Sequence, residues 1–171
     1  GETSIGSFPI ETVKVMARII ERTEEVALDQ IAPLKHSPAT KGGAITKAAT
    51  EVGLTVGAKF LVAFTQSGDS ARRMSRLRSP IPMLALTPEI GTYNRLALSW
   101  GVESMITSVV SHTDEMVMQV DSILIESKRV KIGDLVLIVA GSPPGIPGSI
   151  NAMRVHKIGD AVGGVAPAYR K

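Results

Sequence analysis

Short apolar runs alternate with amphipathic segments along most of the chain, and this alternation predicts the fold. Apolar runs bounded by Gly, Pro or Ser are typical of buried strands, whereas apolar residues three or four positions apart are typical of helices. Strands that alternate with helices favour a mostly parallel sheet covered on both faces, which is the α/β class. Strands are predicted at 59–64, 82–86, 102–108, 134–141 and 152–159, and helices at 43–56, 69–78, 89–99 and 113–129.

The last two predicted strands are joined by a Gly/Pro loop rather than by a helix. A parallel pair needs a long crossover connection, so the strand at 152–159 is expected to lie antiparallel to its neighbour at an edge of the sheet. The preceding helix is expected to be capped by Thr113, a residue type that accepts from the first backbone N–H groups of a helix. Its expected buried stripe consists of Met116, Val120, Ile123 and Leu124.

A long amphipathic segment near the start of the chain predicts one more helix, Pro9–Leu28. Its apolar residues cover an arc of roughly 220°, about twice what an ordinary surface helix needs. Two interpretations are open at this point: the helix is deeply buried, or it contacts two bodies, one of which is absent from this sequence. The Pro-containing stretch 29–41 follows as a predicted linker, and the last dozen residues, rich in Gly, Ala and Pro, are expected to be frayed.

The composition is that of a globular protein, and it narrows the possible partners. Hydrophobic residues make up 44% of the chain and charged residues 20%, which excludes extensive disorder. A formal net charge of +3 is too small to indicate a nucleic-acid or membrane partner, and no apolar run approaches the roughly 20 residues of a membrane span. The absence of Cys excludes disulfides, thiolate catalysis and Cys-based zinc sites, and it fits a reducing cytoplasm.

Few residues suit catalysis or metal binding. The histidines His36, His112 and His156 are scattered, and none has the partner three or four residues away that metal sites use, so no metal site is expected. The sequence contains no Gly-x-Ser-x-Gly elbow, P-loop or Rossmann fingerprint. The chain begins at Gly1 without Met and without a signal-peptide pattern, which predicts that it is processed or cut from something larger.

The turn Thr65–Ser70, between a predicted strand and a predicted helix, is the strongest candidate for a ligand site. In open α/β sheets such turns gather at the carboxyl ends of the strands, where ligands bind. The turn combines three hydroxyl groups, a glycine and the N–H groups of a helix N-terminus, which together suit a phosphate group, and Arg73 and two more arginines follow. The alternative is that Asp69 or Ser70 only caps the helix. The Asp69 carboxylate counts against the phosphate site unless it points away.

Two further segments could contribute to anion binding: a Gly/Pro loop and a basic cluster. The loop Gly141–Gly148 ends a neighbouring strand, and it either closes over the same ligand or is only a long hairpin connection. The basic cluster Lys128, Arg129 and Lys131 follows a predicted helix. It either complements the helix dipole on a solvated face or supplies a second anion contact.

Four segments, in this order, resemble the carboxyl-terminal end of pyruvate kinase. GETSIGSFPIETVKVMARI (1–19) resembles the stretch that closes the catalytic barrel and forms its last helix. TQSGDSARRMSRLRSPIPMLALT (65–87) resembles the family's Thr-x-x-Gly-x-Ser phosphate loop and the following helix. KIGDLVLIVAG (131–141) resembles the strand after a Gly-Asp pair, and GIPGSINAMRVHKIG (145–159) resembles the Pro-Gly…Asn-x-Met-Arg-Val ending. The order and spacing agree over nearly the whole chain.

The resemblance implies a three-layer α/β/α sandwich. Its sheet would be five-stranded and mostly parallel with an antiparallel last strand, and a helix severed from a TIM barrel would precede it. The implied domains are 1–27 as the end of the catalytic barrel, 28–42 as a linker, 43–160 as the α/β domain and 161–171 as a flexible tail. Full-length relatives are cytoplasmic homotetramers, so copies of this chain are expected to associate.

The resemblance also implies a function for the parent protein. Pyruvate kinase transfers a phosphoryl group from phosphoenolpyruvate to ADP in glycolysis, giving pyruvate and ATP, with Mg²⁺ and usually K⁺. Its catalytic residues belong to barrel segments absent here, so we expect this chain to be catalytically silent, with no cofactor of its own. Its regulatory domain would bind a phosphorylated effector, a sugar phosphate or a nucleoside monophosphate. The implied effector site consists of Thr65, Gln66, Ser67, Gly68, Ser70 and Arg73 around one phosphate, with Gly145 and Gly148 in the loop that folds over the ligand.

Two departures from the family pattern bear on the effector. Asp69 stands where bisphosphate-activated animal forms carry a basic residue, and the final loop lacks their aromatic and basic residues. Both disfavour fructose 1,6-bisphosphate and leave a monophosphate or AMP-like effector. Two functions of other classes remain as alternatives: a stand-alone α/β anion-binding or phosphoryl-carrier module, with His112 as the candidate reactive residue, and a pure oligomerisation domain.

Overall fold

The computed structural model describes residues 1–30, 39–142, 144 and 148–163. Its contacts divide the chain into two compact units, Gly1–Pro33 and Leu34–Lys171, and each unit is described by itself. The boundary between the units falls inside the predicted linker at 28–42. Residues 31–38 of that linker and residues 164–171 of the predicted tail lie outside the described part.

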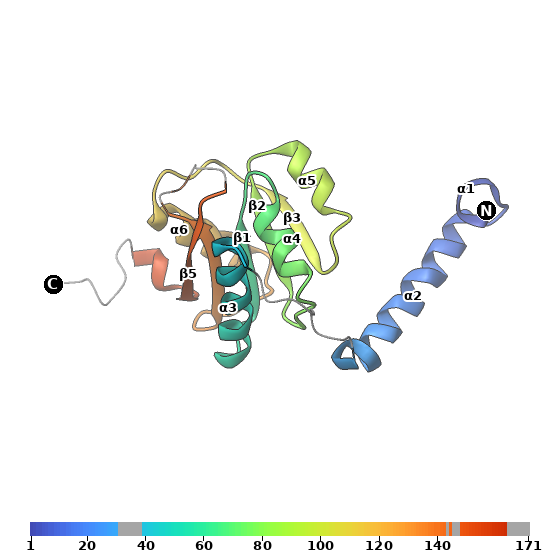
Figure 1. Cartoon of the computed structure of the whole chain (residues 1–171), viewed down its shortest axis with the longest axis horizontal. Helices are drawn as coiled ribbons and strands as arrows, with labels where there is room; N and C mark the ends of the chain where they lie inside the picture. The colour runs from blue at the N-terminus through green and yellow to red at the C-terminus, as the bar shows by residue number, and fades with distance from the viewer. Residues whose placement is uncertain (31–38, 143, 145–147, 164–171) are drawn as a thin grey trace. The chain divides into compact units, whose positions relative to one another are not determined.

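Helices and strands alternate in the second unit in the order that the sequence predicts (Figure 1). The helices α4 (Asp69–Ser75), α5 (Ile90–Leu96) and α6 (Thr113–Glu126) end three residues before the predicted positions, because left-handed backbone at Arg78 (φ +52°), Gly101 (φ +65°) and Lys128 (φ +57°) turns the chain soon after each helix. The elements are α3 (Lys41–Thr55), β1 (Phe60–Phe64), α4 (Asp69–Ser75), β2 (Met83–Thr87), α5 (Ile90–Leu96), β3 (Val102–Ile106), α6 (Thr113–Glu126), β4 (Leu135–Gly141), β5 (Ile150–Lys157) and the 3-10 helix η2 (Asp160–Gly163).

The five strands form one sheet with the order β3-β2-β1-β4-β5. The strands β1 to β4 are parallel, with Leu61 opposite both Met83 and Leu137, and β5 runs antiparallel to β4 at the edge. The predicted mostly parallel sheet with an antiparallel last strand is therefore confirmed. Because β1 to β4 are parallel, their carboxyl ends lie at the same edge of the sheet.

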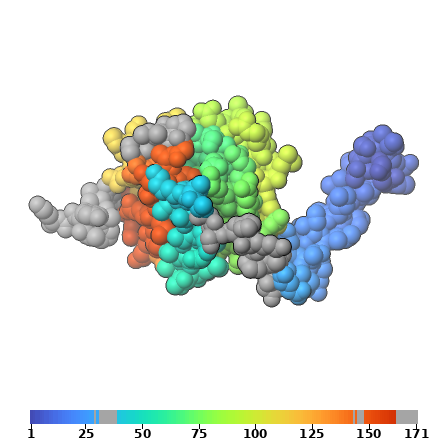
Figure 2. Space-filling view, viewed as in Figure 1, coloured from blue at the N-terminus to red at the C-terminus, as the bar shows by residue number. Residues whose placement is uncertain are grey.

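Alternating side chains of each strand build two apolar cores, one on each face of the sheet. Leu61 and Ala63 of β1 face the core covered by α3, α4 and α5, and Phe60 and Val62 face the core covered by α6 and η2. Figures 1 and 2 view the unit from the side on which α3 and α4 lie next to each other. The three-layer α/β/α sandwich that the sequence predicts is confirmed.

A buried hydrogen bond joins helix α6 to strand β5. Asp121 on α6 and His156 on β5 are each about 2% exposed, and Asp121 Oδ1 lies 2.7 Å from His156 Nε2. The other carboxylate oxygen accepts from the backbone N–H groups of Gly159, at 3.0 Å, and Ala161, at 3.2 Å. One carboxylate therefore ties α6, β5 and the turn that leads into η2 together.

The start of α6 differs from the prediction by one residue. His112 holds the cap position and Thr113 is the first helical residue. The Glu115 carboxylate accepts from the backbone N–H groups of Ser111 and His112, and the Ser111 contact is the main cause of a lowered pKa of Glu115. A lowered pKa in the folded state means that this contact contributes stability at neutral pH, and the contribution is lost as the pH falls through that pKa.

The first unit contains α1 (Glu2–Ile5), α2 (Pro9–Ala27) and the 3-10 helix η1 (Leu28–Gln30). Within the described residues 1–30, no residue of α1 or α2 is buried. The apolar residues Ile10, Val13, Ile19 and Ile20 of α2 are each more than half exposed. In the described part of the chain, no helix is both long and apolar enough to cross a membrane.

Candidate functional site

A pocket lies at the carboxyl edge of the sheet, where the four parallel strands end. Its free volume is about 670 Å³, including space open to solvent. Each parallel strand contributes to the lining: Thr65 follows β1, Pro88 follows β2, Thr107 follows β3 and Gly141 ends β4. The described lining residues are Phe64, Thr65, Gln66, Ser67, Asp69, Ser70, Leu86, Pro88, Thr107, Ser108, Val109, Val110, Met116, Gly141, Pro144, Gly148, Ser149 and Ile150.

The turn between β1 and α4 is held in shape by hydrogen bonds of its own residues. Gly68, just before α4, has φ +83°, a left-handed conformation that glycine adopts without steric cost. The Gly68 N–H donates to Thr65 Oγ1 at 2.9 Å, and the Thr92 hydroxyl of α5 donates to the Gln66 carbonyl at 2.6 Å. No side chain caps α4, so the interpretation of Asp69 or Ser70 as its cap is wrong.

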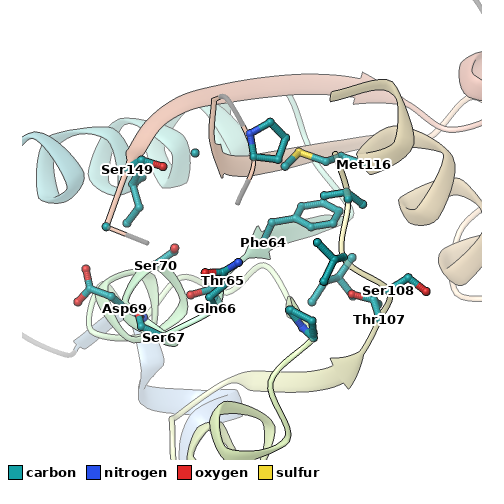
Figure 3. A pocket seen from close by; sticks show the side chains of 18 residues that line it. Phe64, Thr65, Gln66, Ser67, Asp69, Ser70, Thr107, Ser108, Met116 and Ser149 are labelled. Carbon is teal, nitrogen blue, oxygen red and sulfur yellow. The ribbon is translucent and has the colours of Figure 1, made fainter. Parts of the chain in front are cut away.

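This turn presents several donors to the pocket. The backbone N–H groups of Gln66, Ser67 and Ser70 have no acceptor among the residues that the structure describes. The hydroxyls of Ser67 and Ser70 lie beside them, and Figure 3 shows Ser67, Asp69 and Ser70 grouped at one end of the pocket, near Ser149. Convergent N–H and O–H donors around a concave site are suited to the oxygens of an anion.

The side of the pocket across from these donors is largely apolar. Phe64 and Met116 lie there, with Thr107 and Ser108 on the same side (Figure 3), and Val110 packs with Phe64 and Met116. None of the described lining residues is Lys, Arg or His, and Asp69 is the acid among them. The pocket therefore suits a ligand with one anionic group and an uncharged remainder, because a second anionic group would meet no cation among these residues.

The described residues of the connection from β4 to β5 that line the pocket are Gly141, Pro144, Gly148 and Ser149. The ends of this connection are joined by Asn151, whose side chain accepts from the Ser142 N–H at 2.7 Å and donates to the Ser142 carbonyl at 2.6 Å. A Cβ atom on Gly141 would lie 2.1 Å from Ser149 Oγ, so only glycine leaves Ser149 in its place at the rim. Gly148 lines the pocket with φ +77°, and the predicted contact Gly145 lies outside the described residues.

Arg73 does not line the pocket. Its Nε donates to Asp69 Oδ2 at 2.6 Å, and its Nη1 donates to Thr40 Oγ1 at 3.1 Å. Thr40 is the cap of α3, where the same oxygen accepts from the Gly43 N–H at 3.1 Å. The arginine therefore connects the rim of the pocket to the start of another helix.

The structure brings most of the predicted site together. Thr65, Gln66, Ser67, Ser70 and Gly148 line the pocket, and Gly68 shapes the turn without lining it. The sequence did not predict the other lining residues, although the polar residues at the end of the strand predicted at 102–108 were a usable signal for some of them, because β3 ends at Ile106. The missed residues include Phe64, Pro88, Thr107, Ser108, Met116, Ser149 and Ile150.

The basic cluster after α6 lies elsewhere. The Arg129 guanidinium stacks on Phe60, with Cζ 4.5 Å from the ring centroid, and it pairs with Glu103. Phe60 begins β1, whereas the pocket lies where β1 ends at Phe64. The interpretation of Arg129 as a second anion contact is therefore wrong. Within the residues that the structure describes, no three His, Asp or Glu side chains gather in a way that could hold a metal ion.

These features define a class: an α/β domain covered on both faces, with a donor-rich pocket at the carboxyl edge of its parallel strands. The family model described as "Pyruvate kinase, alpha/beta domain" matches residues 43–156. The chain belongs to the pyruvate kinase family.

Individual relatives agree with this assignment. A pyruvate kinase of Mycobacterium tuberculosis is 49% identical, over 94% of this chain and 34% of that protein. A pyruvate kinase of Corynebacterium glutamicum is 41% identical, over 94% of this chain and 33% of that protein. A crystal structure of a pyruvate kinase from Cryptosporidium parvum is similar in fold, with a TM-score of 0.77 and 24% identity over 92% of this chain and 32% of that one. The chain thus spans about a third of the length of these relatives.

Proposed function

We propose that the second unit is the effector-binding regulatory domain of a pyruvate kinase and that its pocket binds a metabolite with one phosphate group. The observation that carries this proposal is that the N–H groups of Gln66, Ser67 and Ser70, which find no acceptor within the described part of the chain, lie next to two hydroxyls in a pocket. A phosphate monoester has three terminal oxygens that accept such bonds, and hydrogen bonds to a charged acceptor are the strong ones.

The remaining lining supports a monophosphate over a bisphosphate. The apolar lining residues Phe64, Pro88 and Met116 suit a sugar ring or a nucleobase, and no cation among the described lining residues would receive a second phosphate. The enzyme as a whole would transfer a phosphoryl group from phosphoenolpyruvate to ADP in the cytoplasm. No three His, Asp or Glu side chains of the described residues gather into a metal site, and we expect other segments of the enzyme to hold the Mg²⁺ and K⁺ that this reaction uses. We expect the chain alone to be inactive.

Calorimetry with glucose 6-phosphate, AMP and fructose 1,6-bisphosphate tests the proposal on the chain and on Ser67→Ala. We expect a monophosphate to bind, and the variant to bind it about tenfold to a hundredfold more weakly, because one hydrogen bond to a charged group is worth roughly 1.5–3 kcal/mol. Ser127→Ala, at the end of α6 and away from the pocket, is the control and should bind normally. Unchanged affinity in Ser67→Ala, or no binding of any phosphate ester, would overturn the proposal.

We further propose that copies of the chain associate through α2. Its apolar residues are exposed in the first unit taken by itself, and burying exposed apolar surface stabilises a complex by roughly 25 cal/mol per Å². Val13 and Ile20 are two helical turns apart on α2 and are 53% and 54% exposed. The chain is expected to sediment as a dimer or a larger species, and Val13→Glu with Ile20→Glu is expected to weaken association by at least about tenfold.

The matched control changes charge on polar positions with the same spacing, Lys14→Glu with Glu21→Lys. It should leave sedimentation unchanged. A chain that sediments as a strict monomer while α2 is helical would contradict the association, and it would leave the effector site unaffected.

A further inference from the structure

We propose that Arg73, which joins Asp69 at the rim of the pocket to Thr40 at the start of α3, is a positioning residue that tunes the charge of the phosphate site and carries its occupancy to α3. This inference rests on the proposed function, because it takes a phosphate group as the ligand of the turn Thr65–Ser70. It adds a residue outside the pocket lining and a physical route from the pocket to another helix.

The geometry places a single guanidinium between two acceptors that belong to different elements. Asp69 lines the pocket, and its carboxylate receives Arg73 Nε at 2.6 Å. Thr40 is outside the lining, and its hydroxyl oxygen receives Arg73 Nη1 at 3.1 Å while it also accepts from the Gly43 N–H. Any movement of the guanidinium toward the pocket therefore removes a bond from the cap of α3.

Electrostatic attraction to a bound phosphate would move the Arg73 guanidinium toward the pocket. A phosphate dianion held beside Ser67 and Ser70 lies near the Asp69 carboxylate, which repels it. The ion pair with Arg73 offsets this repulsion, and the guanidinium is drawn toward the ligand because the phosphate carries more charge than the Thr40 hydroxyl. The side chains of Arg73 and Asp69 are 33% and 40% exposed, so solvent screens the interaction and effects of a few-fold are expected.

Close packing at the start of α3 transmits the change. A Cβ atom placed on Gly42 would lie 3.5 Å from Ile150 Cδ1 and 3.9 Å from Arg73 Nε. Ile150 lines the pocket, so the first turn of α3 lies against both the arginine and a wall of the site. Packed elements of this kind respond to small displacements as units, and α3 is the first described helix after the boundary between the two units.

The affinity for glucose 6-phosphate or AMP, whichever binds the unaltered chain, tests the charge role. Arg73→Gln is expected to weaken binding about fivefold, because Asp69 is left uncompensated, and Asp69→Asn is expected to strengthen it by a similar factor. Thr40→Val is expected to strengthen binding about threefold, because the guanidinium then has one competitor fewer. Thr40→Ser keeps the hydroxyl and is the matched control, with unchanged affinity.

The decisive variant combines Arg73→Gln with Thr40→Val. Thr40 does not line the pocket, and an effect on affinity that acts through Arg73, rather than through the contact of α3 with Ile150, is expected to vanish in the double variant. A purely structural role of Thr40 would leave the same threefold effect with or without the arginine, and that result would overturn the inference.

Hydrogen exchange gives an independent measurement of the route. Saturating ligand is expected to speed exchange of the Gly43 amide in the unaltered chain, because Thr40 is released, and to leave it unchanged in Arg73→Gln. Slower exchange with ligand, or the same change in Arg73→Gln, would contradict the route. If no phosphate ester binds the unaltered chain, the proposed function fails; if one binds without coupling to Thr40, only this inference fails.

Discussion

Replacing Asp121 by alanine is expected to lower the free energy of unfolding of the second unit by about 3 kcal/mol, the largest stability change that we anticipate for one substitution. Asp121 is buried, and its two carboxylate oxygens form hydrogen bonds with the His156 ring and with the backbone N–H groups of Gly159 and Ala161. Alanine would leave an imidazole and two backbone N–H groups buried without their acceptor, and each such group costs roughly 1–3 kcal/mol unless water reaches it.

Chemical denaturation followed by the fluorescence of Trp100 measures this change, because Trp100 is the single tryptophan of the chain and lies in the second unit. The melting temperature is expected to fall by about 10 °C. Asp121→Asn keeps one acceptor in the same place and should lose less. Glu126→Ala, at the exposed end of α6, should change the free energy of unfolding by no more than about 0.5 kcal/mol. A loss below about 1 kcal/mol in Asp121→Ala would mean that water replaces the carboxylate.

This buried pair also shows which features the sequence could not reveal. Asp121 and His156 are 35 residues apart, and they meet because β5 lies at the edge of the sheet beside β4. The helical period correctly assigned Val120 and Leu124 to the buried stripe of α6, and a carboxylate next to Val120 is compatible with an exposed position in that period. Periodicity reports which face of a helix is buried, but it does not report the partner that makes a buried polar residue stable.

The candidate site divides in the same way between local and distant contacts. The turn Thr65–Ser70 was predictable because its hydroxyl groups, its glycine and its free N–H groups come from consecutive residues after a strand. The opposite side of the pocket was not predictable. Thr107 and Met116 lie across from the turn because of the strand order β3-β2-β1-β4-β5, and the spacing of residues along the sequence does not give that order. Arg73 was expected at the ligand from its place on α4, whereas its bonds to Asp69 and Thr40 depend on how α3 packs against α4.

Gly68→Ala is expected to weaken the binding of a phosphate monoester about a hundredfold, the largest change in affinity that we anticipate. Gly68 has φ +83°, where a side chain costs roughly 1–2 kcal/mol. Its Cβ would lie 2.7 Å from Arg72 Nη1 and 3.3 Å from both Leu96 Cδ2 and Thr92 Cγ2. Relief of this crowding rotates the adjoining peptide groups, so the N–H donors on either side of Gly68 no longer converge, and losing two bonds to a charged ligand costs about 3 kcal/mol.

Gly57→Ala provides a matched control for backbone strain. Gly57 also has a left-handed conformation, φ +66°, but it lies between α3 and β1 with no atom within 4 Å of its would-be Cβ. Both variants should lose about 1–2 kcal/mol of unfolding free energy from backbone strain, and only Gly68→Ala should lose affinity. Gly68→Asn, a residue type that tolerates left-handed backbone, should retain part of the binding. Calorimetry with the same ester on all three variants decides the matter, because equal affinities would show that the shape of this turn does not create the site.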